Sequence, residues 1–501
     1  MKTLKVLLLL ALSAATAAAV LTKTSAKLDD DSAIGSKSDS VGGTIKLPKG
    51  KTVPFAAFEI VAKTTSKLAK NPSVTLSIDG VEVAAKTLRN KADAETRLLL
   101  VASREIRRKI KAGRDEADFK ISTKTDGQTK FGIKSVKLWT LTDEKYFRNS
   151  SYIRPVFSGD EVVAESVFPM GDADETKPAS ARLLFAPTEI LDAYTVSGGK
   201  RVDLENGKDF SIEGDRVLFK QSPKYRLFKY RELHSDDKED IEKMGATPPF
   251  YFDVIKKYAF FKEWNWFHTH QIYISYKHRP VNFSDGEQFD ASLLPNTVNF
   301  LKGKKPLKIT LFGDSISSGA NASAVSITIP FMPSWGDIVA QALEKYYKTP
   351  ITYYNRALGG MDSKWGEENA ENLVSPDKPD LVIIAFGMND RKPADKFRES
   401  IQNMISKIRK TNPAAEFILV SSMSANPDWH SFPMHDEYAE VLADMQTKGI
   451  AFADVRKVHK FMLQRKRFID MTGNNVNHPN DFLIRIYAQT VLQKLVPSMS
   501  K

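Results

Sequence analysis

From Lys305 to the C-terminus, short apolar strands alternate with amphipathic helices, and this alternation restricts the fold more than any other feature of the chain. The segment PDLVIIAFG at 379–387 is almost uninterrupted in its apolar character, which is typical of a strand buried on both faces of a parallel sheet. A helix at 396–410 is predicted from one apolar stripe, which consists of Phe397, Ile401, Met404, Ile405 and Ile408. The alternation therefore predicts an α/β domain at 305–501 with a doubly wound parallel sheet.

The chain before this domain shows strands without intervening helices. Between 73 and 88, apolar residues alternate with polar ones on both sides of the dipeptide Asp79-Gly80, which is typical of a β-hairpin. The segment 131–141 alternates in the same way. We expect a β-sandwich-like domain at 42–145, a second β-rich domain at 150–285, and a connector from there to the α/β domain.

Two histidines in the second β-rich domain require an interpretation. The segment 265–278 alternates in the manner of a strand, so that Trp266, His268 and His270 are expected to share one face. Two histidines on one strand face are able to ligate a metal ion. The sequence offers no obvious third ligand, and the alternative is that both rings are structural or lie at an interface.

The first residues, MKTLKVLLLLALSAATAAAV, combine two lysines, an apolar run and small residues. This pattern is typical of a secretory signal peptide, with cleavage expected after Ala17 or Ala19, and we assign 1–25 to the signal peptide and the start of a linker. The alternative is a transmembrane anchor, but the run is short of the roughly 20 residues that a span needs. We therefore expect an exported protein, periplasmic or extracellular, without a stable membrane span.

Composition and charge narrow the chemistry and the partners. The chain contains no cysteine, which excludes disulfides, thiolate zinc sites and a cysteine nucleophile. Its net charge of +12 is compatible with an anionic polysaccharide partner, or with an ordinary basic surface in water. Aromatic and basic residues do not interleave as they do in nucleic-acid-binding proteins, so we expect no nucleic-acid partner.

Polar residues follow the predicted strands of the α/β domain. Ser315 comes after the first strand, Gly360 after the second and Asn389 after the third, while His478 lies just before the last helix. Ligands of such sheets bind beyond the carboxyl ends of the strands, so we expect these four residues at one site. Each of them alone is ordinary turn or capping material, and it is their combination that indicates a catalytic site.

This combination fits nucleophilic catalysis. A serine hydroxyl is a poor nucleophile until a base accepts its proton, and His478 is the candidate base for Ser315. The tetrahedral intermediate also needs donors aimed at its oxyanion, each worth on the order of 3 kcal/mol. Gly360, through its backbone N–H, and Asn389, through its side-chain amide, are the candidate donors, with the backbone of the Ser315 segment as a third.

The four blocks resemble those of the SGNH (GDSL-type) hydrolase superfamily: FGDSIS with Ser315, NRALGG with Gly360, FGMND with Asn389 and NHPND with His478. The resemblance covers 307–496 and implies a flavodoxin-like sheet. It also implies Ser315 as nucleophile, His478 as base, and an oxyanion hole of Ser315, Gly360 and Asn389, with no metal or organic cofactor. The β domains ahead of the hydrolase domain are similar to those of exported bacterial members that act on acylated carbohydrates.

One position departs from the family pattern. The family usually has Asp three residues before the histidine, whereas this chain has Asn475 there, and an amide cannot stabilise imidazolium as an anion does. The alternatives are a dyad oriented by a backbone carbonyl, Asn475 as a neutral orienting group, or a carboxylate from elsewhere, for which Asp470 is the candidate. We expect Asp314, Asp390 and Asp481 to cap or hold loops.

The remaining expectations concern the substrate. His430 and Trp429 follow the fourth strand and are candidate substrate-binding residues, with a loop position without a role as the alternative. We expect an exported serine esterase that hydrolyses acyl esters, with O-acetyl as the expected group, on carbohydrates. The alternatives are a lipase or thioesterase with the same catalytic set and a non-catalytic carbohydrate-binding surface protein. The small, polar loops around Ser315 argue against a lipase, and the complete catalytic set argues against a non-catalytic protein.

Overall fold

The computed structural model describes the strands β1 to β10 with Leu47 in the N-terminal part, and residues 156–246, 248–282 and 289–497. The signal-peptide pattern at 1–20 lies outside the described residues. None of the helices in the described ranges combines the length and the hydropathy that crossing a bilayer requires.

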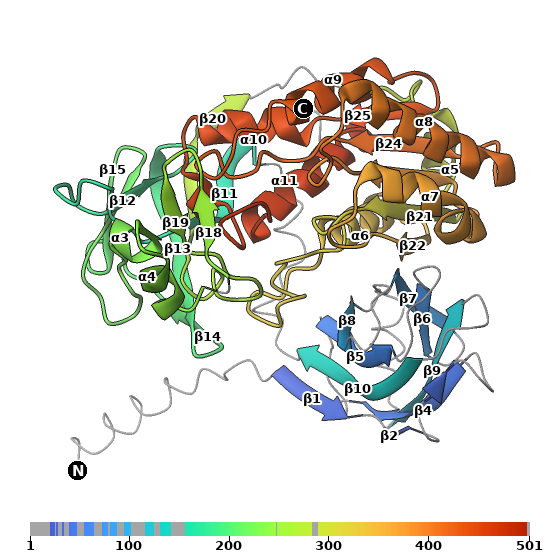
Figure 1. Ribbon diagram of the computed structural model, residues 1–501, viewed down its shortest axis with the longest axis horizontal. Helices are drawn as coiled ribbons and strands as arrows, with labels where there is room; N and C mark the ends of the chain where they lie inside the picture. Colours follow the sequence, from blue (N-terminus) through green and yellow to red (C-terminus); the bar gives the residue numbers. More distant parts are fainter. Residues whose placement is uncertain are drawn as a thin grey trace, which may run out of the picture.

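Two antiparallel sheets form the N-terminal part (Figure 1). The first has the order β1-β10-β5-β8, with β3 also paired to β10, and the second has the order β2-β4-β9-β6-β7. The bounds are β1 Leu21–Ser25, β2 Lys27–Leu28, β3 Ala33–Ile34, β4 Ser40–Lys46, β5 Phe55–Thr64, β6 Ser73–Ile78, β7 Val81–Thr87, β8 Glu95–Val101, β9 Glu116–Lys124 and β10 Phe131–Leu141. Ile78 of β6 pairs with Val81 of β7, which confirms the predicted hairpin.

The β-rich domain, residues 156–282, contains the sheets β11-β20-β13-β14, β12-β16-β15 and β17-β19-β18. The bounds are β11 Ser158–Val167, β12 Ser180–Arg182, β13 Pro187–Ser197, β14 Lys200–Asp203, β15 Phe210–Glu213, β16 Arg216–Phe219, α3 Tyr230–Leu233, β17 His234–Ser235, α4 Lys238–Lys243, β18 Phe250–Phe252, β19 Lys257–Ala259 and β20 Ile272–Asn282. The strand predicted from residue 265 begins only at Ile272. His268 and His270 lie in the turns before it, so the prediction that they share a strand face is wrong.

The α/β domain, residues 289–497, has a parallel sheet of order β22-β21-β23-β24-β25, which confirms the doubly wound, flavodoxin-like prediction. The bounds are α5 Pro295–Lys302, β21 Leu307–Gly313, α6 Trp335–Tyr347, β22 Ile351–Asn355, α7 Ser363–Leu373, η2 Ser375–Asp377, β23 Leu381–Ala385, α8 Ala394–Thr411, β24 Glu416–Val420, α9 Met434–Asp444, β25 Ile450–Ala453, α10 Val455–Leu463, η3 Phe468–Asp470 and α11 Asp481–Leu492. The helix α5 lies in the predicted connector, where Pro295 starts it at its first position.

Helices cover both faces of this sheet, as alternation along the strands requires. In β23, Leu381 and Ile383 belong to one core, while Val382 and Ile384 belong to another. The first core also contains residues of α6, α10 and α11, and the second contains residues of α7, α8 and α9. Since successive side chains of a strand point to opposite faces, a strand between two helical layers is apolar throughout.

The β-rich domain shares its core with the α/β domain. Val162 of β11 and Tyr194 of β13 belong to the same buried cluster as Leu311 of β21 and Tyr487 of α11. Figure 1 shows α11 between the β-rich domain and the parallel sheet, and α11 contacts β11. The two domains therefore pack as one body around α11, and the C-terminal edge of the parallel sheet lies where they meet.

Candidate active site

The loops after β21, β22 and β23 are fastened to one another at the C-terminal edge of the sheet. Leu358 N donates to Gly313 O at 3.0 Å, and Asn355 Nδ2 donates to Ser317 O at 2.8 Å. Only glycine fits at position 313, because a Cβ there would clash with the Ala385 carbonyl of the neighbouring strand. The segment that carries Ser315 is thus held in place by both neighbouring strands.

Ser315 and His478 lie within proton-transfer distance of each other. The distance from His478 Nε2 to Ser315 Oγ is 2.9 Å, and each residue is 8% exposed. Ser315 lies at the start of a tight turn, and the Asp314 carboxylate caps this turn by accepting from Ile316 N at 2.9 Å. A hydroxyl that donates to a neutral imidazole at this distance is arranged for general-base activation.

The loop before α11 fixes the position of His478. Its N–H donates to Asn474 Oδ1 at 3.0 Å, and its carbonyl accepts from Thr472 Oγ1 at 2.9 Å. Asn480 then caps α11 by accepting from Phe482 N and Leu483 N. These bonds hold the backbone on both sides of the imidazole, so the ring does not depend on Ser315 for its position.

Two side chains face the other ring nitrogen. His478 Nδ1 lies 2.7 Å from Asn321 Oδ1 and 3.2 Å from Glu263 Oε2. Glu263 belongs to the turns before β20 in the β-rich domain. Burial alone raises the pKa of Glu263, but the His478 imidazole and hydrogen bonds from Asn474 and Asn321 bring it below its usual value. Sequence reasoning missed both residues, because Glu263 is 215 residues away and no spacing rule connects it to the histidine.

His268 supports Asn321. Its Nε2 donates to the Asn321 carbonyl at 2.6 Å, and its Nδ1 lies 3.2 Å from Tyr273 Oη. His270 donates to the Trp266 carbonyl at 2.7 Å and stacks on the Trp266 ring. Within the described ranges, no cluster of three or more His, Cys, Asp or Glu side chains is suited to hold a metal ion. The structural interpretation of the two histidines is the one that their contacts support.

The side chains of Asp470 and Asn475 form hydrogen bonds with groups other than the His478 imidazole. Asp470 is fully buried and accepts from Phe168 N at 2.7 Å and from the Arg467 guanidinium at 2.9 Å. Asn475 donates through Nδ2 to Phe260 O at 3.0 Å. This corrects the expectation that Asp470 orients the imidazole, because its carboxylate instead fastens the loop before α11 to the end of β11. Asn475, in left-handed backbone with a φ of 69°, likewise serves the domain interface.

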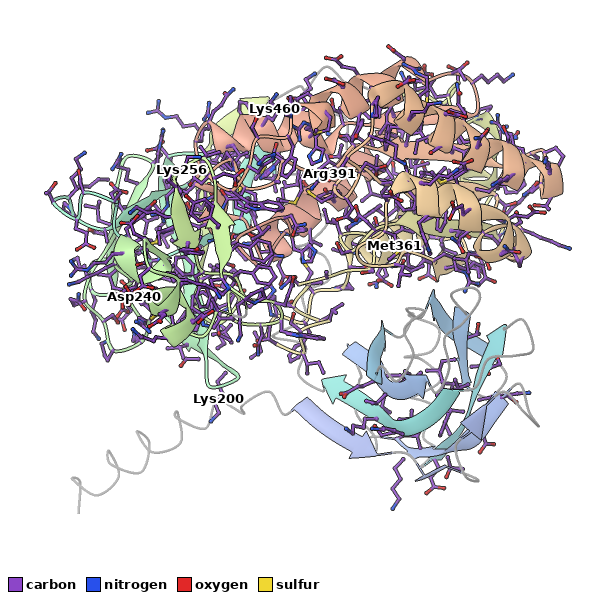
Figure 2. All side chains as sticks on the ribbon, viewed as in Figure 1. Lys200, Asp240, Lys256, Met361, Arg391 and Lys460 are labelled. Atoms are coloured by element: carbon purple, nitrogen blue, oxygen red, sulfur yellow. The ribbon has the colours of Figure 1, made fainter. Side chains whose placement is uncertain are left out.

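The candidate oxyanion donors lie on the two adjacent loops. Gly360 has a φ of 81°, which glycine adopts without strain, and Asn389 Nδ2 donates to the carbonyl of Met361 at 3.0 Å. In Figure 2, Met361 and Arg391, which belong to these loops, lie within the α/β domain, near the middle of the molecule. The structure therefore brings the Gly360 and Asn389 loops together. Their role at an oxyanion stays a prediction.

Three other carboxylates near the motifs hold loops, as expected. Asp390 accepts from Ser363 N and Oγ at the start of α7, and Asp481 accepts from Ser323 N at 2.9 Å. Burial raises the pKa of Asp314 to about 7, although the Ile316 N–H and the nearby His478 act in the opposite direction. Asp314 thus titrates in the neutral range, beside the nucleophile.

His430 and Trp429 both contact the β-rich domain. His430 Nδ1 forms a close contact with Asp253 Oδ2, and Trp429 accepts from Asp253 N at 2.9 Å through its carbonyl. The Trp429 ring packs edge-on against Phe250. These contacts place the pair at the junction of the two domains, and their role in substrate binding stays a prediction.

Residues 311–482 match the GDSL-like Lipase/Acylhydrolase family. No curated protein matches the chain. Among solved structures, the acetylxylan esterase Axe2 from Geobacillus stearothermophilus is 18% identical, over 38% of this chain and 94% of that one, with a TM-score of 0.32. A two-domain esterase (CEX) active on acetylated mannans is 19% identical, over 43% of this chain and 56% of that one, with a TM-score of 0.36.

Proposed function

We propose that this chain, in which residues 311–482 form a domain of the GDSL-like lipase/acylhydrolase family, is a serine esterase that removes acetyl groups from carbohydrates. The observation that carries the proposal is the 2.9 Å contact between Ser315 Oγ and His478 Nε2 at the C-terminal edge of the sheet. The signal-peptide pattern at the N-terminus adds export to the proposal.

The mechanism follows from this contact. His478 Nε2 takes the proton of Ser315 as Oγ attacks the ester carbonyl, and the oxyanion that forms is stabilised by Gly360 N–H, Asn389 Nδ2 and the backbone N–H of Ser315. The imidazolium then protonates the leaving sugar oxygen. A water molecule, deprotonated by the same imidazole, attacks the acetyl-serine, releases acetate and restores Ser315.

A small acyl group fits the surroundings of Ser315. Three large apolar side chains of its loop face inward: Ile316, Phe331 and Met332 are each at most 3% exposed. A long acyl chain binds against exposed apolar surface, and these residues offer almost none. This observation favours acetyl esters over the long-chain esters of a lipase.

An aromatic side chain beside the site favours a carbohydrate as the alcohol. Trp264 follows Glu263 directly, its carbonyl accepts from Asn321 Nδ2 at 3.2 Å, and the residue is 50% exposed. Its φ of 74° is unusual for a tryptophan, so the surrounding contacts hold it in a costly conformation. An exposed ring held at such a position is suited to pack against the apolar face of a sugar.

The proposed activity is tested by measuring hydrolysis of p-nitrophenyl esters of two, four and eight carbons and acetate release from acetylated xylan and mannan. We expect turnover of the acetate ester to exceed that of the eight-carbon ester by about 100-fold, since one or two mismatched methylenes already cost 10- to 200-fold. Preference for the eight-carbon ester would support the lipase alternative. If none of these substrates is turned over, the result would support the alternative of a non-catalytic carbohydrate-binding protein.

Replacing Trp264 with Ala is expected to raise KM for acetylated oligosaccharides by about 5-fold, because the sugar loses a stacking surface worth roughly 1 kcal/mol. Turnover of p-nitrophenyl acetate is expected to stay within about two-fold of the wild type, because that substrate carries no sugar. Tyr346→Ala is the matched control, since Tyr346 is also 50% exposed but lies near the end of α6, which leads to the opposite edge of the sheet. Equal KM values for both variants would contradict the assignment.

A further inference from the structure

The β-rich domain contributes a side chain to the active site of the α/β domain. We propose that Glu263 is the positioning residue that supplies the negative charge next to the imidazole of His478, in place of the missing family aspartate, so that neither domain alone holds a complete active site. The inference rests on the proposed function, because it concerns how the base of that reaction is oriented and charged.

The two contacts at Nδ1 together supply what a single aspartate usually supplies, which is an acceptor that orients the ring and a negative charge. Because Nε2 accepts from Ser315, the one proton of the neutral ring is on Nδ1, where it faces Asn321 Oδ1 at 2.7 Å and Glu263 Oε2 at 3.2 Å. The amide of Asn321 has one possible orientation, since its Nδ2 donates to the carbonyls of Trp264 and Gly473. Asn321 therefore sets the tautomer as a neutral acceptor, and Glu263 adds the charge that stabilises imidazolium.

Contacts from both domains hold Glu263 at this position. Asn474 Nδ2 donates to Glu263 Oε1 at 3.2 Å, which occupies the oxygen that does not face the histidine. On the other side, Phe260 accepts from Asn475 Nδ2, and its ring packs on Trp266 within the aromatic core of the β-rich domain. The turn that bears the carboxylate is thus anchored on both sides of the domain boundary.

The charge state of Glu263 agrees with this role. Its pKa is below the usual value, so the carboxyl is ionised between pH 5 and 8, where a histidine base operates. The side chain is 37% exposed, and the water around it screens its charge. We therefore expect the effect of this partly screened charge on the reaction to be smaller than that of a fully buried aspartate.

The test compares Glu263→Gln with the wild-type chain in p-nitrophenyl acetate hydrolysis between pH 5 and 9. We expect kcat/KM at pH 8 to fall about 10- to 100-fold, less than the 10⁴-fold seen when a sole orienting aspartate is replaced, because Asn321 still sets the tautomer. We also expect the acid limb of the pH profile to move to lower pH, because the anion that favours the protonated imidazole is gone.

The position of the acid limb shows whether Glu263 acts through its charge or only through its packing. The ionisable groups that face the imidazole are Glu263 and the buried Asp314. Asp314 is unchanged in both proteins, so the difference between the two profiles reports the removal of Glu263. Glu263→Asp keeps the charge and is expected to retain the wild-type acid limb with a smaller loss of rate. The matched control is Asp236→Asn, which removes an exposed carboxylate of the same domain that pairs with Lys257, and we expect a wild-type profile.

Two results would overturn the inference: a Glu263→Gln variant with wild-type rate and acid limb, or one that loses rate without any movement of the limb and is not improved by Glu263→Asp. Either result leaves the proposed function intact as long as Ser315→Ala is inactive. If Ser315→Ala retains the wild-type rate, the proposed function itself fails, and the two failures are thereby distinguishable.

Discussion

Replacing Ser315 with Ala is expected to lower kcat for p-nitrophenyl acetate by about 10⁴-fold or more, because removing the nucleophile of such a serine hydrolase disables the whole catalytic unit. Ser315 lies 2.9 Å from the only imidazole nitrogen available to take its proton in the described site, His478 Nε2. The expected loss is therefore in kcat, with substrate binding retained. Single-turnover assays that detect acetate and any acetyl-enzyme are the measurement.

Ser326→Ala is the matched control for this prediction. It removes a buried hydroxyl of the same segment that has no hydrogen-bond partner in the described part of the chain, so the same chemical change is made without touching the base. We expect wild-type turnover and a melting temperature within a few degrees of the wild type. A Ser315→Ala variant that is folded and retains more than about 1% of the wild-type kcat would exclude Ser315 as the nucleophile.

The largest expected effect on stability comes from Lys466→Met. Lys466 Nζ lies 2.6 Å from Glu165 Oε1, both side chains have no exposed surface, and the ammonium also donates to the carbonyls of Ser166 and Arg182. Removing one partner leaves a buried carboxylate without its counter-charge, which costs about 3–5 kcal/mol. In a unit of this size we expect the melting temperature to fall by roughly 10 °C.

Lys460→Met is the control, because Lys460 forms an exposed ion pair with Asp436 that is worth less than about 0.5 kcal/mol. Adding Glu165→Gln to Lys466→Met is expected to restore part of the stability, since the uncompensated charge is then gone. Calorimetric melting of the four proteins checks this ranking. Equal melting temperatures for Lys466→Met and Lys460→Met would contradict the expected contribution of the buried pair to stability.

Predictions from hydrophobic periodicity were confirmed where the pattern is compatible with only one type of secondary structure. The apolar run at 379–387 contains the buried strand β23, and the stripe from Phe397 to Ile408 lies on α8. The strands β6 and β7, which flank Asp79-Gly80 in the sequence, pair with each other as the predicted hairpin requires. The alternation that included His268 and His270 failed, because the backbone N–H groups of Thr269 and His270 donate to carbonyls three or four residues earlier and form turns instead of a ladder. The His270 ring also bonds to the Trp266 carbonyl within these turns.

The sequence predicted those residues of the candidate site that directly follow a strand or directly precede a helix of the α/β domain. Ser315, Gly360 and Asn389 follow strands whose order in a parallel sheet brings their ends to one edge, and His478 precedes the helix that closes the domain. The partner of the imidazole followed no such rule. Asp470, eight residues from His478, was the natural candidate by proximity in sequence, yet its carboxylate accepts from Phe168 N and Arg467.

The amino-acid sequence by itself determined the doubly wound sheet and the four residues at its edge, because strand and helix periods and short motifs are local properties of the chain. Only the tertiary structure decided which side chains face His478 Nδ1, because Glu263 reaches it through the packing of a separate β-rich domain on α11 and its neighbouring loops. Contacts between distant segments depend on how whole layers pack, and no spacing along the chain encodes them.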